Sequence, residues 1–447
     1  MTSRPLRYYA GVLEFLSVWL VGLLLSWAVQ GAALAREKKP TADELLASAD
    51  ARIEKCRKAD VAIVVTDRDG RSVPGASVRV VQLRHAFLFG CNIFPLFTYK
   101  GEQHETYGRE FAALFNYATL PFYWGGYEPK PGEKHVAANE RLARWCRDHG
   151  IVTKGHPLVW HIVYPSWAPS DPDETRAKLE ARVTDVVGHF KGLIDRWDVV
   201  NEVMSSANYD NGVGHWVKRD GTAAVVGQAL EWAHAANPQA VLLYNDFDAG
   251  PQVEKLVGNL QQNHKPLGAI GFQSHMHTAE WPLERAWQVC ETYARFGVPL
   301  DFTELTVLSG HYKTDNDWFK FHPDWPTTPE GETRQADYVP KFYTLLFSHP
   351  AVEAITWWDF MDGGWQGAPA GLVRADLTPK PAYERLRELI KGKWWTTCEL
   401  KTDARGRGQV RGFLGQYRVT VVTPDGEVSR EFELKRDSKE WSFRLDH

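Results

Sequence analysis

The chain has 447 residues and a formal charge of −4, with 44% hydrophobic and 24% charged side chains. This composition is typical of a globular protein and excludes collagen-like, low-complexity and wholly disordered chains. Because basic residues are not in surplus, we expect binding neither to nucleic acid nor to an anionic membrane. Aromatic residues are abundant, with 19 Trp, 16 Tyr and 21 Phe, which suits either a large core or a site that stacks flat ligands.

The first 35 residues have the pattern of a secretory signal peptide. Arg4 and Arg7 provide a positive start, residues 15–29 an apolar run, and residues 33–35 an A-x-A cleavage site. The run is shorter than the ~20 apolar residues that span a bilayer, and an uncleaved N-terminal anchor is the alternative. We therefore expect a secreted or periplasmic mature chain, free of the membrane, and we expect it to be a monomer.

The cysteines predict no zinc site. They are Cys56, Cys91, Cys146, Cys290 and Cys398, and none lies in a C-x-x-C or His-paired spacing. A bridge between Cys56 and Cys398 is conceivable in an oxidising compartment, but buried free thiols are the simpler expectation.

Two β-rich segments flank the middle of the chain. Residues 36–60 are charged and predict a linker with a short helix, and residues 61–85 predict a strand, a turn and a strand. Residues 393–447 alternate in the same manner. We expect residues 61–85 and 393–447 to pack together as one small β-module beside the central domain.

The central domain, residues 86–392, alternates short apolar runs with longer amphipathic segments. The expected strands lie near residues 88–93, 117–122, 151–160, 194–202, 240–247, 269–276, 299–307 and 354–360. Strand–helix alternation predicts a parallel sheet, and eight such units favour a closed (β/α)₈ TIM barrel of the α/β class. An open doubly wound sheet is the competitor, but no glycine-rich phosphate-binding turn follows the first strand.

Nearly every expected strand ends in a polar or aromatic residue. These residues are His156, Trp160, Asn201, Glu202, Asn245, Asp246, Gln273, His275, Glu304 and Trp358. In a TIM barrel the C-terminal strand ends meet on one face, which is where active sites are built. We therefore expect these side chains to form one site.

Glu202 and Glu304 end the fourth and seventh expected strands, which face each other across such a barrel. Burial raises the pKa of a carboxyl and suits it to act as a general acid, and two carboxylates around one bond are what glycoside hydrolysis requires. A lone Glu at a strand end is more often solvated or half of an ion pair, whereas a facing pair favours catalysis. The alternative is a metal site built from His156, His161, His275 and His277. Neighbouring Trp and Asn residues suit sugar binding better, so we expect no metal.

Several motifs resemble those of the glycoside hydrolase family 10 xylanases, which are retaining (β/α)₈ enzymes. In chain order they are GHPLVWH (155–161), PSW (165–167), WDVVNE (197–202), YNDF (244–247), IGFQSH (270–275), FTE (302–304), Trp358, Asp362, Trp365 and KPAY (380–383). The flanking β segments are similar to those around plant-type members. The resemblance covers most of the barrel and implies that no metal or organic cofactor is needed.

The resemblance also implies roles for the matching residues. Glu304 would be the nucleophile, and Glu202 would protonate the leaving oxygen and then deprotonate the incoming water. Asn201 would bind the 2-hydroxyl of the cleaved sugar, and His275 would orient Glu304 and keep it ionised. The remaining substrate-binding residues would be His156, Trp160, Gln273, Trp358 and Trp365. The last two would form the apolar walls of that subsite.

The sequence departs from the family pattern at three places. Residues 120–125 (LPFYWG) replace a Glu-Asn and Lys-Trp pattern that grips the sugar on the non-reducing side. Thr306 replaces an Asp, so a hydroxyl rather than a charge faces His275, and Phe247 replaces a Tyr. The substrate is therefore less firmly implied than the class of reaction.

We predict a secreted, retaining endo-1,4-β-xylanase that acts on plant cell-wall xylan. One alternative is a retaining glycosidase with a different or shorter substrate, in which residues 123–127 cap the groove and reduce it to a pocket. The other is a carbohydrate-binding protein that has lost turnover. The expected partner in each case is a polysaccharide or oligosaccharide.

Overall fold

The computed structural model describes residues 39–423 and 426–445, so the expected signal peptide lies outside the described residues. The chain divides into residues 1–44 and residues 45–447. The short helix α2 (Ala42–Ala47) spans this division. None of the helices in the described part combines the length and apolar character that crossing a bilayer requires.

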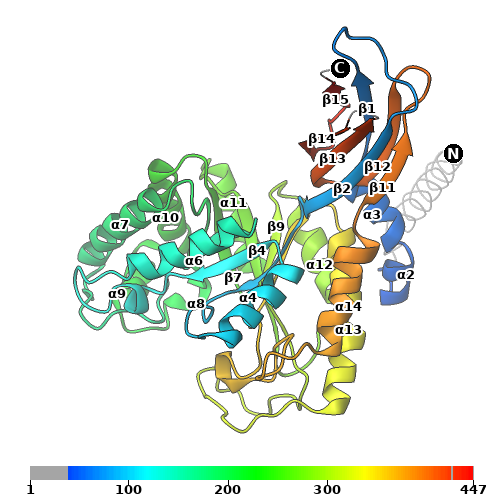
Figure 1. The fold of residues 1–447 in the computed structure, drawn as a ribbon. Helices are drawn as coiled ribbons and strands as arrows, with labels where there is room; N and C mark the ends of the chain where they lie inside the picture. The colour runs from blue at the N-terminus through cyan, green and yellow to red at the C-terminus, as the bar shows by residue number, and fades with distance from the viewer. Residues whose placement is uncertain (1–38, 424–425, 446–447) are drawn as a thin grey trace, which may run out of the picture. The chain divides into compact units, whose positions relative to one another are not determined.

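Among the described residues, eight parallel strands close into a barrel (Figure 1). In chain order they are β3 (Leu88–Asn92), β4 (Tyr117–Pro121), β5 (Val152–His156), β6 (Arg196–Asn201), β7 (Val241–Asp246), β8 (Ala269–Met276), β9 (Leu300–Val307) and β10 (Val352–Trp357). Each strand pairs with its neighbour in sequence, and β10 pairs with β3 to close the barrel. The predicted (β/α)₈ barrel is confirmed, and the open sheet is excluded.

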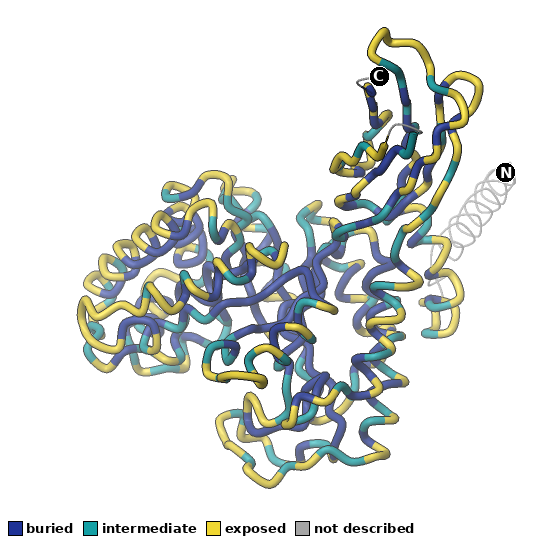
Figure 2. The backbone as a smooth tube through the Cα atoms, in the orientation of Figure 1, coloured by how far each residue is buried: buried dark blue, intermediate teal, exposed yellow. Residues whose placement is uncertain are grey.

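Helices connect successive strands and cover the outside of the barrel. They are α4 (Glu102–Leu114), α5 (Trp124–Tyr127), α6 (Val136–Asp148), α7 (Pro172–His189), α8 (Val203–Ser206), α9 (Gly212–Asp220), α10 (Thr222–Ala236), α11 (Pro251–Gln262), α12 (Leu283–Ala294), α13 (Pro329–Ser348) and α14 (Pro381–Glu388). Burial follows this layering. In Figure 2 the barrel strands are mostly buried (dark blue), and much of the outer helices and loops is exposed (yellow).

Local sequence explains where the long helices begin. Asp171 caps α7 by accepting hydrogen bonds from the backbone of Asp173 and Glu174, and Thr328 caps α13 through Gly331. In both helices proline occupies the first turn, where its missing N–H costs nothing. Inside the barrel, Gly155 of β5 is required by close packing, since a Cβ there would lie 2.0 Å from the Trp197 ring.

The flanking segments form two further sheets. One contains β12 (Arg407–Phe413), β1 (Lys58–Thr66) and β15 (Glu440–Arg444), and the other contains β11 (Thr397–Lys401), β2 (Ser77–His85), β13 (Gly415–Thr423) and β14 (Gly426–Leu434). The expected pairing of N- and C-terminal flanks in one β-module is confirmed. The two N-terminal strands do not pair with each other, however, because each joins a different sheet.

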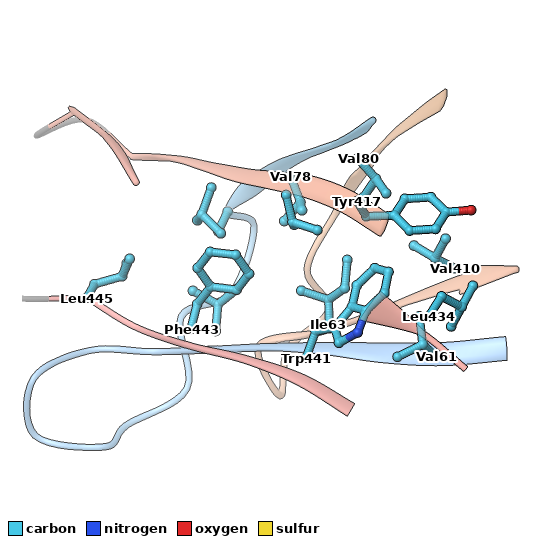
Figure 3. Close-up of a cluster of buried hydrophobic side chains, with 14 of the residues drawn as sticks. Val61, Ile63, Val78, Val80, Val410, Tyr417, Leu434, Trp441, Phe443 and Leu445 are labelled. Atoms are coloured by element: carbon cyan, nitrogen blue, oxygen red, sulfur yellow. The ribbon is translucent and has the colours of Figure 1, made fainter. Parts of the chain in front are cut away.

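An apolar core lies between these two sheets (Figure 3). Its fully buried members include Ile63 from the first sheet and Val80 and Tyr417 from the second, with Trp441 between them. The alternation along β1, β2 and β13 places one face of each strand in this core and leaves the other toward solvent. The module therefore has its own hydrophobic centre, separate from that of the barrel.

The segment before β1 is helical, in line with the short helix expected there, and it continues into β1 without a linker. The helix α3 (Ala49–Arg57) runs directly into β1, which begins at Lys58 rather than near residue 61. Arg57 donates hydrogen bonds to the backbone oxygens of Phe347, His349 and Val352 at 2.6–2.7 Å. Its guanidinium thus caps the C-terminal end of α13 and ties the module to the barrel.

A buried histidine forms a second junction. His85 is the last residue of β2, and its ring lies edge-on to Phe89 of the barrel, Phe347 of α13 and Phe413 of β12. Its Nδ1 contacts Gln82 at 3.2 Å, and burial lowers the pKa of His85 to about 3. This residue is therefore a neutral packing element.

The five cysteines are free thiols, as expected, and no bridge joins Cys56 to Cys398. Cys398 is partly exposed, and the other four are buried.

Candidate active site

The barrel brings the predicted site residues to one face. They come from the C-terminal ends of strands β5, β6, β8 and β9 or from the loops directly after β5, β6 and β10. Every one of the nine residues proposed from the sequence lies there: His156, Trp160, Asn201, Glu202, Gln273, His275, Glu304, Trp358 and Trp365. Hydrogen bonds and ring contacts link them into one network.

Glu202 has an unusual backbone. It follows β6 directly and adopts φ 55° and ψ 42°, the left-handed region that residues other than glycine rarely occupy. Its amide donates a 2.8 Å hydrogen bond to the backbone oxygen of Asn245 on the next strand. Backbone strain of this kind concentrates at functional sites, where the surroundings hold it in place.

Three donors surround the Glu202 carboxyl. Oε1 accepts from Gln273 at 2.8 Å and from Asn201 at 3.1 Å, and Oε2 accepts from the Trp160 indole at 3.0 Å. Burial, together with the negative charge of Glu304, raises the pKa of Glu202 to about 7, although the hydrogen bonds from Gln273 and Trp160 oppose this rise. Glu202 therefore holds a proton at mildly acidic pH, as a general acid requires.

Glu304 is more deeply buried but has the opposite shift. Its Oε1 accepts from the Asn245 amide at 2.9 Å, and its Oε2 lies 3.1 Å from His275 Nε2. Burial alone would raise the pKa of Glu304, but the hydrogen bond from His275 and the charges of His156, His275 and Lys154 outweigh it and lower the pKa. The two carboxyl groups are thus held in different protonation states.

Side-chain amides connect the two carboxyls. Asn245 donates to Asn201 Oδ1 at 2.8 Å and to Glu304, while Gln273 donates to Glu202 and lies 3.4 Å from the same Asn201 oxygen. Asn201 is therefore the centre of a chain that runs from one carboxyl to the other. An amide in this position is well placed to bind a hydroxyl of a ligand between them.

A charged pair lies below the site inside the barrel. Lys154 Nζ lies 2.6 Å from Asp198 Oδ2, and both side chains have no exposed surface. The same carboxylate lies 2.7 Å from His156 Nδ1, and His156 Nε2 is 3.8 Å from Glu304. Burial opposes ionisation of Asp198, but Lys154 and His156 outweigh it and keep the pKa of Asp198 low. The carboxylate fixes the orientation of the imidazole.

The segment after β4 contributes one ring to the site and buries two others. Tyr123 lies edge-on to His156 at 5.4 Å and 5.6 Å from the Trp160 ring. Trp124 and Tyr127 are buried instead, and Trp124 donates to Glu128 at 3.1 Å. A cap over the groove built from residues 123–127 is therefore restricted to Tyr123.

Two tryptophans lie on the side of the site that β10 provides. Trp358 is buried, with its ring 5.4 Å from both His156 and Phe94. Trp365 is exposed, and its ring lies 4.5 Å from that of His275. Asp359 fixes this loop by accepting the Trp365 backbone N–H at 2.5 Å.

Two of the departures from the family pattern also lie at this face. Thr306 Oγ1 accepts from the Met276 backbone at 3.0 Å and lies 3.5 Å from His275 Nδ1, so its contact with the imidazole is weak. Phe247 follows β7 and is exposed.

A hollow of about 460 Å³ lies between the loop after β5 and the start of α9. His161, Tyr164, Tyr209 and Asn211 are among its lining residues. The His161 and Tyr209 rings lie 4.2 Å apart. His161, which lines this space, directly follows Trp160, the residue that donates to the Glu202 carboxyl.

The histidines considered as metal ligands serve other purposes. His161 contacts the hydroxyls of Ser206 and Ser205 at 2.9 and 3.3 Å, and His277 Nδ1 lies 3.1 Å from Gln366. Within residues 39–423 and 426–445, no group of three or more His, Cys, Asp or Glu side chains is arranged to hold a metal ion.

Sequence reasoning did not assign roles to several residues of this network. Asn245 stood out only as a polar strand end, and Lys154, Asp198, Asp359 and Phe94 received no role. The available signal for Lys154 and Asp198 was a charged residue in the middle of each of two strands whose residues are mostly buried. Charged residues are rarely buried unless they are paired.

Comparison with known proteins places this geometry in context. The model of glycosyl hydrolase family 10 matches residues 88–389, which is most of the chain. Endo-1,4-beta-xylanase 1 of Arabidopsis thaliana is 26% identical over 88% of this chain and 40% of its own length. Endo-1,4-beta-xylanase B of Thermotoga neapolitana is 29% identical over 60% of this chain and 75% of its own length.

Another relative is named as a regulatory protein and not as a hydrolase. The anti-sigma-I factor RsgI6 of Acetivibrio thermocellus is 28% identical over 87% of this chain and 48% of its own length. The chain thus spans less than half the length of RsgI6 and of the Arabidopsis thaliana xylanase. Among solved structures, native xylanase 10B from Thermotoga maritima is 25% identical with a TM-score of 0.59, covering 69% of this chain and 96% of that one.

Proposed function

Because this chain belongs to glycosyl hydrolase family 10, we propose that it is a retaining endo-1,4-β-xylanase that cleaves plant cell-wall xylan. One observation carries the proposal. Glu202 and Glu304 lie in one hydrogen-bonded network, yet the pKa of the first is raised to about 7 and that of the second is lowered. Retaining glycosidases require such a pair, a proton donor and an ionised nucleophile.

The reaction then has two steps. In the first, a Glu304 oxygen attacks the anomeric carbon while Glu202 gives its proton to the departing oxygen, so the glycosidic bond breaks as an ester bond to Glu304 forms. In the second, ionised Glu202 takes a proton from water, and the hydroxyl attacks the same carbon and releases Glu304. Asn201, between the two carboxyls, is placed to bind the sugar 2-hydroxyl.

Xylan is supported as the substrate by the names of the xylanase relatives and by the walls of the site. Tyr123, Trp160 and Trp365 offer ring faces on which neutral pyranose rings pack. A shorter substrate remains the alternative within the same chemistry, since residues 120–125 lack the charged pattern of the family.

A catalytically silent carbohydrate-binding protein is the second candidate, because one relative that matches 87% of this chain is named as an anti-sigma-I factor and not as a hydrolase. The protonation states of Glu202 and Glu304 favour turnover instead, since binding alone needs no such difference. The two candidates differ in whether sugar is cleaved or only bound.

The test is to incubate the protein with linear xylan, arabinoxylan and mixed-linkage β-glucan, and to separate the products by chain length. Xylo-oligosaccharides of several lengths, absent with Glu304→Ala, are expected for an endo-xylanase. Release of single sugars only would indicate a pocket and a shorter substrate. Binding without any product, unchanged by Glu304→Ala, would identify the silent binding protein.

We further propose that the protein is exported and acts as a monomer. The positive start, the apolar run and the A-x-A site within residues 1–35 support export. Secretion from a host, followed by N-terminal sequencing, should give a chain that begins at Arg36. Size-exclusion chromatography with light scattering should give the mass of one chain.

A further inference from the structure

The large apolar side chains that are exposed in the described residues are not spread evenly. They are Val163, Phe247, Phe319, Phe321 and Trp365, and each belongs to a loop that follows a barrel strand on the catalytic face. Single exposed apolar residues need no explanation, but a group on one face marks a binding surface. The most exposed are Phe319 and Phe321, at 70% and 60%.

Both phenylalanines lie in the loop that connects β9, which carries Glu304, to α13. Neither ring contacts another aromatic ring within residues 39–423 and 426–445, so they do not stabilise the loop by stacking. The loop has other anchors. Trp325 donates to the backbone oxygen of His311 at 2.9 Å, and the Lys313 amide donates to that of His277 at 2.7 Å.

Further hydrogen bonds fix the loop against the Trp365 turn. The backbone N–H of His322 donates to the Gln366 oxygen at 2.8 Å, and the Gln366 side chain donates to the Trp318 oxygen at 2.8 Å. The segment that carries the two phenylalanines is therefore bound on both sides. In Figure 1 the loops after β9 and β10 lie beside each other, in yellow and orange. A loop held in this way presents its rings at little cost in conformational entropy.

The aromatic surface continues from the catalytic residues to this loop. The Trp365 ring lies 4.5 Å from His275, which contacts Glu304, and the Trp318 ring is stacked on Trp365 at 5.9 Å with an interplanar angle of 22°. Phe319 follows Trp318 directly in the chain. The exposed pair thus belongs to the loop whose Trp318 ring is stacked on Trp365, beside the catalytic residues.

We propose that Phe319 and Phe321 form an additional binding platform for the sugar backbone of a polysaccharide chain that extends out of the active site. This inference rests on the proposed function. A neutral β-linked chain fits because its pyranose faces are apolar and its edges are polar. The phenylalanines supply ring faces, while Asp317 and His322 supply polar groups beside them.

The platform contacts sugars remote from the cleaved bond, so it acts on long substrates only. The test compares the unaltered chain with three variants. They are Phe319→Ala/Phe321→Ala, Phe319→Tyr/Phe321→Tyr and the control Lys320→Ala, which removes the exposed side chain between the two rings. Each is assayed on soluble linear xylan and on an aryl β-xylobioside, and kcat and KM are measured separately.

We expect the double variant to lose roughly five- to ten-fold in kcat/KM on xylan, mainly through KM. Its kcat/KM on the aryl xylobioside should change by less than about two-fold, because the short substrate ends before the platform. Lys320→Ala should behave as the unaltered chain, and Phe319→Tyr/Phe321→Tyr should retain activity on xylan because it keeps both rings.

Two results would overturn the platform. One is unchanged kinetics of the double variant on xylan, and the other is an equal loss on both substrates, which would indicate a distorted site. Failure of the proposed function gives a different result, because the unaltered chain itself would then not cleave xylan. In that case the platform proposal would also be wrong.

Discussion

A hydrogen bond of 2.9 Å joins the side chains of Asn245 and Glu304 across the intervening strand β8. The Asn245 amide has no freedom to turn away, because its oxygen accepts from the Thr303 hydroxyl and its nitrogen also donates to Asn201. The nucleophile therefore receives a fixed N–H on one oxygen and the His275 ring on the other. Both contacts favour the ionised carboxylate.

Replacing Asn245 should weaken the enzyme without removing its catalytic pair. A hydrogen bond to a charged group contributes about 1.5–3 kcal/mol, so Asn245→Ala should lower kcat/KM by roughly 10- to 100-fold. The acidic limb of the pH profile should move to higher pH, because the pKa of Glu304 rises when the donor is lost. Asn263→Ala, an exposed amide at the end of α11, is the matched control. An unchanged acidic limb in Asn245→Ala would contradict this role.

The pH dependence of kcat/KM should be bell-shaped. Activity falls above about pH 7, where Glu202 loses its proton, and falls again at low pH, below the ordinary glutamate value of 4.5, where Glu304 gains one. The two apparent values belong to the interacting pair rather than to either residue alone. With an aryl glycoside whose leaving group needs no proton, Glu202→Ala should lose the alkaline limb of the first step. A profile flat from pH 5 to 9 would contradict the assignment of Glu202 as the acid.

The ionised Glu202 carboxylate should also lower the free energy of unfolding at alkaline pH. Its folded-state pKa of about 7 lies above the ordinary 4.5, so the folded protein binds this proton more tightly than the unfolded chain does. The tighter proton binding stabilises the folded protein fully below pH 4.5, and this stabilisation is lost as the pH rises through 7. The buried charge of Glu202 then lowers the free energy of unfolding by up to about 3 kcal/mol relative to low pH. Glu202→Gln should therefore raise Tm at pH 8 more than at pH 5, as measured by calorimetry. An equal shift at both values would show that the charge is not the cause.

The buried Lys154–Asp198 pair should be costly to break on one side. Asp198→Asn leaves the Lys154 ammonium buried without its partner, which should reduce the free energy of unfolding by about 3–5 kcal/mol. Lys154→Met in the same background should recover part of that loss, because it removes the unpaired charge.

An exposed pair provides the comparison for this measurement. Arg418 and Glu431 lie 2.9 Å apart on β13 and β14, and Glu431→Gln should cost less than about 1 kcal/mol. Equal losses for the two pairs in urea denaturation would contradict the difference in burial.

Much of the barrel could be predicted from the sequence, because parallel strands buried on both faces are nearly continuous apolar runs. β9 is the clearest case, since every residue from Leu300 to Val307 is buried. Glu202 and Glu304 could be found because they interrupt such runs at the expected end of the strand. The register of β1 and β2 could not be found in this way, because their partners lie more than 300 residues further along the chain.

The parts of the site that escaped prediction depend on tertiary contacts. Asn245 acquires its role only when β7 and β9 are placed on either side of β8, and Lys154 is neutralised by a residue of the next strand. Trp124 and Tyr127 resemble a surface cap in sequence, but both rings are buried and pack beside the Arg182 guanidinium. The direction of an aromatic side chain in a short loop is set by the space that neighbouring elements leave.

The stereochemistry of hydrolysis tests the central assignment most directly. We would follow cleavage of xylohexaose by proton NMR and record which anomer of the new reducing end appears first. Glu304 as a covalent nucleophile predicts the β-anomer, followed by slow mutarotation, and none with Glu304→Ala. Initial release of the α-anomer would show inversion at the anomeric carbon and would contradict the account.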